Sequence, residues 1–194
     1  MQNSDTFRIL TVCTGNICRS PVAERLLQKG LNDLHPGKFI ISSAGTSALV
    51  GQPMQPLAEE IVNAYGGDPS AFAARQITQS IVRDADLVLV LTMQHRAAVL
   101  KLAPSMLKKT FSVREFSRML DHLISYEQHE QASDVVDLWR RLPAQAAAVR
   151  QETLAETDAD NDVIDPFRRS PAIYRQMEDE LIPALNSIVA YARL

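Results

Sequence analysis

The sequence predicts an α/β fold with a parallel β-sheet. Short apolar runs with strand character alternate along the chain with stretches of helical periodicity, which is the pattern of strand–helix–strand units. The clearest run, DLVLVLT at 86–92, is apolar throughout its centre, as is typical of a strand buried on both faces of a parallel sheet. In such sheets, functional residues gather at the carboxyl ends of the strands.

The predicted elements follow one another in a regular order. Strands are expected at 7–12, 38–43, 86–92 and 108–113. A first helix is expected to begin at residues 20–21, because apolar residues then recur with helical spacing at Val22, Leu26, Leu27, Leu31 and Leu34. Further helices are expected at 56–65, where Gly66 and Gly67 stop the helix, and at 93–102, 114–124, 133–150 and 171–192. Pro183 is expected to bend the last of these.

The segment VCTGNICRSP at 12–21 joins the first strand to the first helix. Ser20 suits the N-cap of that helix, and Pro21 suits its first position, where the missing N–H costs nothing. The helix N-terminus then directs its unpaired N–H groups and its positive dipole end toward the segment. Gly15 is expected to take a positive φ, which lets successive N–H groups point inward as an anion nest.

Cys13 and Arg19 lie six positions apart in this segment. A guanidinium holds two oxygens of a phosphate at once, and helix N-termini and nearby cations stabilise a cysteine thiolate. Cys13 is therefore expected to be largely thiolate at neutral pH and to attack phosphorus as a nucleophile. The alternative is a buried structural cysteine beside an ion-paired arginine; the position between strand and helix favours a phosphatase that works through a cysteinyl-phosphate.

Composition predicts one globular domain. The chain has 194 residues, of which 46% are hydrophobic and 22% charged, and its net charge of −3 argues against nucleic-acid binding by bulk electrostatics. No run approaches the length of a membrane span, and no signal-peptide pattern opens the sequence. Both cysteines lie in one short segment, which excludes an extracellular disulfide framework and favours the cytoplasm. The four histidines form no ligand pair with the cysteines, so neither a metal nor a cofactor is expected.

The segment at 12–21 resembles the signature of low-molecular-weight protein tyrosine phosphatases, and Ser43-Ala44-Gly45-Thr46 and Asp165-Pro166-Phe167 match the same family. The resemblance implies a single three-layer α/β domain over 1–194, with a four-stranded parallel sheet flanked by helices and a phosphate-binding loop after the first strand. It implies Cys13 as nucleophile, Arg19 as oxyanion holder and Asp165 as general acid. Substrate-binding residues are then expected at Thr14, Gly15, Asn16, Ile17, Cys18, Ser20 and Phe167, with Asn16 holding the loop in shape and Ser20 bonding the thiolate.

A general acid is needed independently of the family. A phenolate leaves poorly unless it is protonated, and positioned acid catalysis typically contributes about 10²–10⁴-fold. Pro166 stiffens the turn after Asp165, and the ionised carboxylate can activate water in the second step. The alternative is that Asp-Pro only initiates a turn.

The region at about 120–161 departs from the family and is expected to be an inserted helix followed by an acidic loop. The acidic tract at 152–162 contains no basic residue, and it is interpreted as a solvated connection, a mobile loop, a lid or a partner-binding segment. The spacing of the acidic residues in this tract does not match that of a calcium-binding loop. Trp139 is interpreted as a core anchor.

Several single residues carry open alternatives. Cys18 either captures oxidised Cys13 as a disulfide or is a small buried apolar residue. Arg75 matches a family arginine that braces the loop, but Phe72 replaces the histidine that family members often have three positions earlier. The basic side chains of Arg114, Arg118, Arg168 and Arg169 are expected to be solvated or ion-paired, although the last two can attract acidic substrate flanks.

Ile17 and Phe167 favour phosphotyrosine as substrate, because both offer apolar surface to an aromatic ring; family members that act on phosphoarginine carry Thr at the position of Ile17. The alternatives are a protein-arginine phosphatase, an arsenate reductase that uses an external thiol, and a silent phosphate-binding module. An ATP-binding loop is excluded because Gly-Lys-Ser/Thr is absent. The expected partner is a phosphotyrosine-containing protein, with no nucleic acid and no membrane span, and the chain is expected to be a monomer or a weak dimer.

Overall fold

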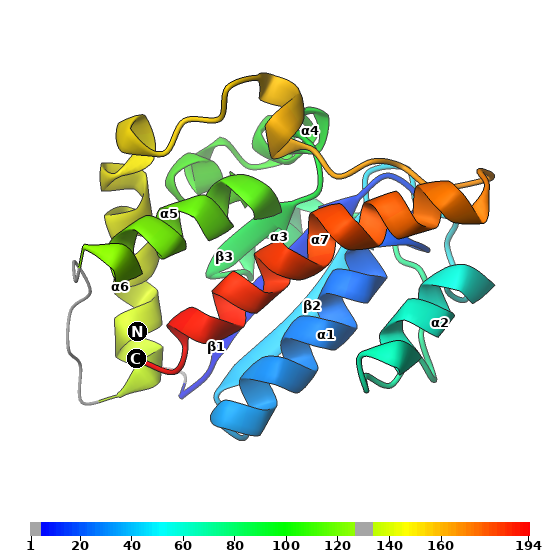
Figure 1. Ribbon diagram of the computed structural model, residues 1–194, viewed down its shortest axis with the longest axis horizontal. Helices are drawn as coiled ribbons and strands as arrows, with labels where there is room; N and C mark the ends of the chain where they lie inside the picture. The colour runs from blue at the N-terminus through cyan, green and yellow to red at the C-terminus, as the bar shows by residue number, and fades with distance from the viewer. Residues whose placement is uncertain (1–4, 127–133) are drawn as a thin grey trace.

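The computed structural model describes residues 5–126 and 134–194, with a four-stranded parallel sheet at its centre (Figure 1). The strands lie in the order β2-β1-β3-β4 and comprise β1 (Phe7–Cys13), β2 (Phe39–Gly45), β3 (Leu87–Val90) and β4 (Thr110–Ser112). Cys13 pairs in register with Gly45, and Val12 pairs with Val90, so the carboxyl ends of three strands meet at one edge. The predicted fold class is confirmed.

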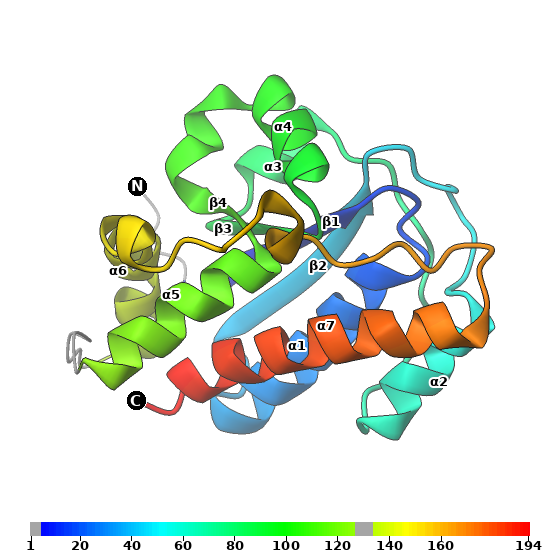
Figure 2. The same cartoon turned by 45° about the horizontal axis from the view of Figure 1, so that its top comes forward.

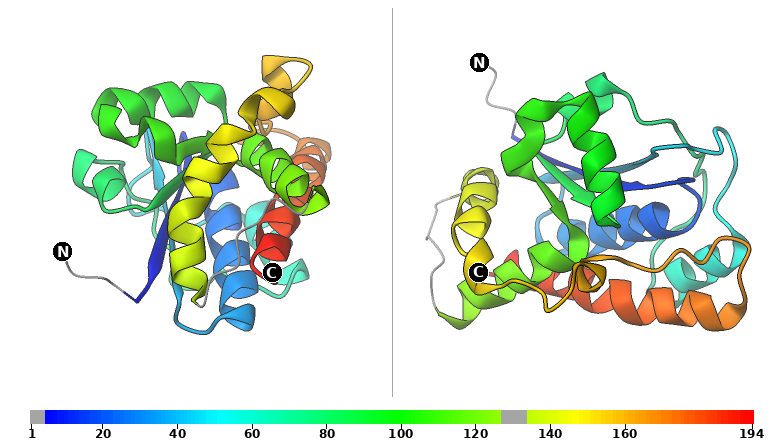
Figure 3. Two further views of the ribbon diagram at one scale, coloured as in Figure 1. Left: turned by 90° about the vertical axis from the view of Figure 1, so that its left-hand side faces the viewer. Right: turned by 90° about the horizontal axis from the view of Figure 1, so that it is seen from above.

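Helices cover both faces of the sheet (Figures 2 and 3). On one face, α1 (Arg19–Leu34) packs on β1 and β2, α5 (Val113–Ser125) contacts β3, and α7 (Pro171–Tyr191) lies between these two helices. On the other face lie α3 (Gln79–Arg83) and α4 (Met93–Leu102). Helix α2 (Pro56–Ala64) packs against α1 and α7.

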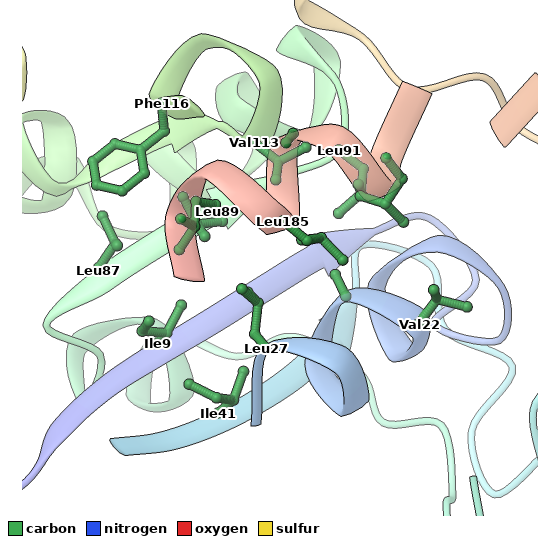
Figure 4. Close-up of a cluster of buried hydrophobic side chains, with 14 of the residues drawn as sticks. Ile9, Val22, Leu27, Ile41, Leu87, Leu89, Leu91, Val113, Phe116 and Leu185 are labelled. Atoms are coloured by element: carbon green, nitrogen blue, oxygen red, sulfur yellow. The ribbon is translucent and has the colours of Figure 1, made fainter. Parts of the chain in front are cut away.

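The sheet separates two apolar clusters, and β3 contributes to both. Leu87 and Leu89 point toward α1, α5 and α7 (Figure 4), whereas Val88 and Val90 join the smaller cluster on the side of α4. Successive side chains of a strand point to opposite faces, so a strand covered on both faces needs an unbroken apolar run. This is the physical reason for the run at 86–92.

Helix α6 (Val135–Ala148) is anchored by Trp139, whose side chain is fully buried. The indole packs edge-to-face on Phe7, Phe39 and Tyr191, at centroid distances of 5.6, 4.9 and 6.4 Å. These rings come from β1, β2 and the end of α7, so α6 is packed into the main core. The interpretation of Trp139 as a core anchor is confirmed; residue 133, the predicted start of this helix, lies outside the described residues.

Three local predictions differ from the structure. Strand β4 is only three residues long, because 104–109 form a 3-10 helix (Pro104–Lys109) and Ser112 caps α5, accepting a hydrogen bond from the N–H of Glu115. Helix α3 was not expected; it is begun by Thr78, whose side chain accepts from the N–H of Ile81. The prediction of Ser20 as N-cap is wrong, since α1 already begins at Arg19 and the hydroxyl of Ser20 bonds other side chains.

Trp139→Ala is expected to lower the free energy of unfolding by about 3–5 kcal/mol, because it leaves a large cavity among three rings. Thermal unfolding followed by circular dichroism measures this change. The control is Leu154→Ala, which truncates a side chain that is 64% exposed and is expected to leave the midpoint nearly unchanged. A midpoint of Trp139→Ala equal to that of the control would show that α6 is not part of the cooperative core.

Candidate active site

The site lies in the loop that joins β1 to α1, at the carboxyl edge of the sheet; this segment, residues 13–19, is called the β1–α1 loop below (Figure 2). Four of its carbonyl oxygens accept hydrogen bonds from the chain that follows β2. The donors to the carbonyls of Cys13, Thr14, Gly15 and Ile17 are the N–H groups of Thr46, Ser47, Leu49 and Gln55, at 2.9–3.0 Å. Because these carbonyl oxygens point toward the chain after β2, the N–H groups of the loop point to the opposite side, toward the inside of the loop.

The N–H groups of Gly15, Ile17, Cys18 and Arg19 find no hydrogen-bond partner among the described residues. Several free N–H groups beside a helix N-terminus form a site for an anion. The left-handed residue that lets the loop curl is Asn16, with φ of 55°, whereas Gly15 has no positive φ. The prediction for Gly15 is therefore wrong; asparagine tolerates this conformation when its side chain is hydrogen-bonded locally.

The side chain of Asn16 is fully buried and holds the loop in shape. Its Nδ2 donates to the hydroxyls of Ser20 (2.9 Å) and Ser43 (2.8 Å), and its Oδ1 accepts from the N–H of Arg75 (2.9 Å). Asn16 thereby ties the loop to the first turn of α1, to β2 and to the segment at 75. Here Arg75 braces Asn16 through its backbone, while its Nε donates to the carbonyl of Ser43 at 2.6 Å.

Glu24 takes part in the same network. The hydroxyl oxygen of Ser43 accepts a hydrogen bond from Asn16 Nδ2, and the hydroxyl donates a hydrogen bond to Glu24 Oε2. Phe72 instead packs beneath the guanidinium of Arg25, 5.7 Å from the ring centre. The network therefore ends on the side chain of Glu24, whereas Phe72 contacts Arg25.

Cys13 is 2% exposed, and its sulfur lies 3.0 Å from Ser20 Oγ and 3.3 Å from the N–H of Asn16. Because Ser20 Oγ already accepts from Asn16, its own hydrogen is free to point at the sulfur. Two donors then face Cys13 Sγ, an arrangement that suits a thiolate.

Arg19 and Asp165 meet although they are 146 positions apart. The side chain of Arg19 is 4% exposed. Its Nη1 donates to the carbonyl of Val163 at 3.1 Å, and its Nη2 forms an ion pair with Asp165 Oδ2 at 2.7 Å. Arg19 Nε is buried and has no hydrogen-bond partner among the described residues. The side chain of Asp165 remains 48% exposed, so it lies at the mouth of the site.

Cys13, Arg19 and Asp165 line one pocket of about 110 Å³. Asn16 and Ser20 do not line it, because they lie behind the loop and support it. Sequence reasoning missed Ser47 and Leu49, which reach the pocket through their backbone bonds to the loop. The full lining comprises Cys13, Thr14, Gly15, Ile17, Cys18, Arg19, Ser47, Leu49, Asp165 and Phe167.

The entrance to the pocket has apolar walls. Ile17 is nearly fully buried, Leu49 is 41% exposed, and Phe167 is half-buried, with the guanidinium of Arg168 5.1 Å from its ring centre. Arg168 itself has a positive φ of 59°. These walls offer contact area to a flat apolar group that enters with an anion.

Cys18 is buried beside Tyr174, whose hydroxyl lies 3.5 Å from the sulfur. Burial raises the pKa of the Cys18 thiol to about 11, so this cysteine is protonated at neutral pH. The thiol is packed as a small apolar group in this state. Its capture of oxidised Cys13 stays a prediction.

The acidic tract is held by two arginines of α5. Arg114 Nη1 donates to the carbonyl of Asp162 at 2.9 Å, and Arg118 donates to the carbonyls of Thr153 and Asp160 and to the side chain of Asn161. Both side chains are half-buried, and their hydrogen bonds to backbone carbonyls and to an amide were not expected from the sequence. They fasten the stretch that leads directly to Asp165.

Within the described residues, no group of three or more His, Cys, Asp or Glu side chains is arranged to hold a metal ion. The same residues contain no helix that is long and apolar enough to cross a membrane.

A family model described as low molecular weight phosphotyrosine protein phosphatase matches residues 8–124 of this chain, which is more than half of it. The chain belongs to this family. The match includes the whole β1–α1 loop with Cys13 and Arg19, but it ends before α6 and Asp165.

Comparison with individual members of the family agrees. The low molecular weight protein-tyrosine-phosphatase Wzb of Salmonella typhi is 41% identical over 102 residues, which are 53% of this chain and 65% of the relative. The chain thus matches slightly less than two thirds of that relative's length. Among solved structures, the tyrosine phosphatase AmsI of Erwinia amylovora is 26% identical with a TM-score of 0.62, covering 96% of this chain and 95% of the other. The YwlE arginine phosphatase of Geobacillus stearothermophilus is 26% identical with a TM-score of 0.66, covering 95% and 91%.

Asn16→Ala is expected to weaken the binding of inorganic phosphate by about tenfold or more. The substitution removes three hydrogen bonds and leaves an alanine in a left-handed conformation, so the N–H groups of the loop lose their common direction. Isothermal titration with phosphate measures the effect. Asn63→Ala, on an exposed face of α2, is the matched control and is expected to bind like the wild type; equal affinities of the two variants would contradict the supporting role of Asn16.

Proposed function

We propose that this protein is a protein tyrosine phosphatase that hydrolyses phosphotyrosine through a cysteinyl-phosphate intermediate. The observation that carries the proposal is the convergence of Cys13, Arg19 and Asp165 on one pocket. Phosphate binding alone requires neither a nucleophile nor an acid at the mouth of the pocket. The family membership and the name of the relative Wzb support the same activity.

In the first step, the phosphate dianion binds among the free N–H groups of the β1–α1 loop and the guanidinium of Arg19. Its oxygens take the place of the Asp165 carboxylate on Arg19. The half-exposed Asp165 side chain must then rotate away from Arg19, and its Oδ1 gives up or re-forms the hydrogen bond that it accepts from the N–H of Phe167 at 3.1 Å. The thiolate of Cys13 attacks phosphorus in line with the bond to the phenolic oxygen. Asp165, in its protonated form, gives its proton to that oxygen as the P–O bond breaks.

In the second step, a water molecule replaces the departed phenol. Asp165, now a carboxylate, accepts a proton from this water as it attacks the phosphorus of the cysteinyl-phosphate. The S–P bond breaks, inorganic phosphate leaves, and the Cys13 thiolate is restored. Arg19 and the loop N–H groups stabilise the negative charge on the equatorial oxygens in both steps, because they are positioned before the substrate arrives.

The substrate side of the proposal rests on the walls of the pocket. Ile17, Leu49 and Phe167 present apolar surface where the group carrying the phosphate must lie, and a phenyl ring gains more from such contacts than a guanidinium does. We propose a phosphotyrosine-containing protein as substrate, although one structural neighbour is named an arginine phosphatase.

We further propose that residues 1–194 form a single phosphatase domain that acts in the cytoplasm as a monomer or a weak dimer. The contacts of Trp139 with β1, β2 and α7 support the view that the inserted helix belongs to this domain. The bonds of Arg114 and Arg118 support a fixed connection, rather than a mobile loop, between that helix and Asp165.

Hydrolysis of para-nitrophenyl phosphate in the presence of a chelator tests the mechanism. Cys13→Ser is expected to abolish turnover, and Asp165→Asn is expected to slow it at least about tenfold, because the acid and base are lost. The loss in Asp165→Asn is expected to be larger with phenyl phosphate, whose leaving group needs the proton more. Asp33→Asn, on the exposed end of α1, is the matched control.

If the Cys13→Ser variant still hydrolyses the substrate, Cys13 is not the nucleophile. An effect of Asp165→Asn that is independent of the leaving group would overturn its role as acid. A wild-type enzyme that is inactive on phosphate esters and reduces arsenate with an added thiol would support the arsenate reductase alternative instead.

Substrate choice is tested with a phosphotyrosine peptide and a phosphoarginine peptide of the same sequence. The wild type is expected to prefer phosphotyrosine in kcat/KM. Ile17→Thr is expected to shift the ratio toward phosphoarginine by about tenfold, because a hydroxyl can accept a hydrogen bond from a guanidinium. Faster turnover of phosphoarginine by the wild type would make the protein an arginine phosphatase.

A further inference from the structure

His95 is a buried histidine that the mechanism above does not use. It lies in the first turn of α4, three positions after the N-cap Thr92, and is only 4% exposed. It does not line the pocket, but its ring Nε2 lies 2.8 Å from the hydroxyl of Thr14, which does. Its ring Nδ1 lies 2.9 Å from the hydroxyl of Thr92.

The hydrogen bonds of Thr92 favour one tautomer of this ring. Thr92 Oγ1 already accepts from the backbone N–H of His95 at 3.2 Å, and its own hydrogen has no acceptor among the described residues other than His95 Nδ1. If Thr92 donates to Nδ1, the ring hydrogen is on Nε2 and is donated to Thr14 Oγ1. The other tautomer leaves the hydrogen of Thr92 without an acceptor.

The surroundings also keep the ring neutral. Burial lowers the pKa of His95 to about 4, and the positive charge of Arg19 acts in the same direction, while Asp165 opposes it. The position in the first turn of a helix adds the positive end of the helix dipole. The imidazole is therefore uncharged at neutral pH.

We propose that His95 is a positioning residue that holds the hydroxyl of Thr14 as a hydrogen-bond donor toward the oxyanion in the pocket. Thr14 Oγ1 accepts the Nε2 hydrogen of His95, so its own hydrogen is left for a ligand oxygen. In the other tautomer, Thr14 donates to the ring and has no hydrogen to offer. The inference rests on the proposed function only in taking phosphate as the ligand.

The support for His95 is itself fixed to the segment that carries Asp165. The N–H of Val163 donates to the carbonyl of Leu91 at 2.8 Å, and the N–H of Met93 donates to Asp162 Oδ1 at 2.7 Å. The turn from β3 into α4 thus contacts the acid segment on one side and the β1–α1 loop on the other. A rigid support of this kind is what the precise direction of one hydroxyl requires.

The tautomer is tested directly by ¹⁵N NMR of the imidazole rings in the full chain at pH 6. The signals of His95 are those missing from the spectrum of His95→Gln. We expect a neutral ring protonated at Nε2, at a pH where an ordinary histidine is mostly charged. A ring protonated at Nδ1, or an imidazolium, would overturn the proposal.

The action through Thr14 is tested by a double-mutant cycle on the binding of inorganic phosphate, measured by isothermal titration. Thr14→Val and His95→Leu are each expected to weaken binding about tenfold, as expected for a hydrogen bond to a charged group. The double variant is expected to lose no more than either single variant, because both remove the same donor. Thr14→Ser and His95→Gln, which keep a hydroxyl and a side-chain N–H donor, are expected to stay within about threefold of the wild type.

Additive losses of about a hundredfold in the double variant, or unchanged binding in His95→Leu, would overturn the proposal. If His95→Leu does not fold, His95→Gln, Thr14→Val and the spectrum of the wild type still decide it. A wild-type protein that hydrolyses para-nitrophenyl phosphate and binds phosphate, but fails these tests, refutes the role of His95 alone. A wild type that does neither refutes the proposed function as well.

Discussion

The buried amide of Asn16 is the interaction on which the rest of the site depends. It lies at the point where β1, α1, β2 and the segment at 75 come together, and it uses both ends of its amide to join them. Its own backbone is left-handed, a conformation that the side-chain bonds stabilise. Because the loop carbonyls are held from outside by the chain after β2, the N–H groups can only face inward. The direction of these N–H groups is therefore a consequence of how the loop is held, by hydrogen bonds with α1, β2, the segment at 75 and the chain after β2.

A second constraint brings a distant carboxylate to this site. The chain between Cys13 and Asp165 includes the inserted helix α6, yet Asp165 reaches Arg19 at ion-pair distance. Two sets of bonds make this possible. Arg114 and Arg118 of α5 donate hydrogen bonds to the stretch before Asp165. Leu91 and Met93, in the turn after β3, form hydrogen bonds with residues 162–163 at the end of that stretch. The inserted helix lengthens the chain between Cys13 and Asp165, but it is fixed to the core because Trp139 packs against three aromatic rings.

The sequence was sufficient for the fold class and for placing Cys13 and Arg19 together on one loop at a strand end. The continuous apolar run at 86–92 has a single simple explanation, burial on both faces, and the alternation of strands and helices then requires a parallel sheet. The spacing of Cys13 and Arg19 places both on one short loop whatever the remainder of the chain does. Errors arose where a residue type has more than one use. Ser20 suits an N-cap but is needed by Asn16, and a glycine accepts a positive φ without requiring one.

Local sequence therefore determined that a cysteine and an arginine share one short loop at the end of a strand. Only the tertiary structure decided which side chains support and surround that loop. Ser47, Leu49 and His95 carry no motif, and they reach the site through hydrogen bonds to residues far away in the sequence. Likewise, the arginines of α5 donate hydrogen bonds to backbone carbonyls, and the pattern of charged residues in the sequence does not predict these partners. The physical reason is that periodicity and spacing report on neighbours along the chain, whereas hydrogen-bond partners across the fold exist only once the strands have paired and the helices have packed.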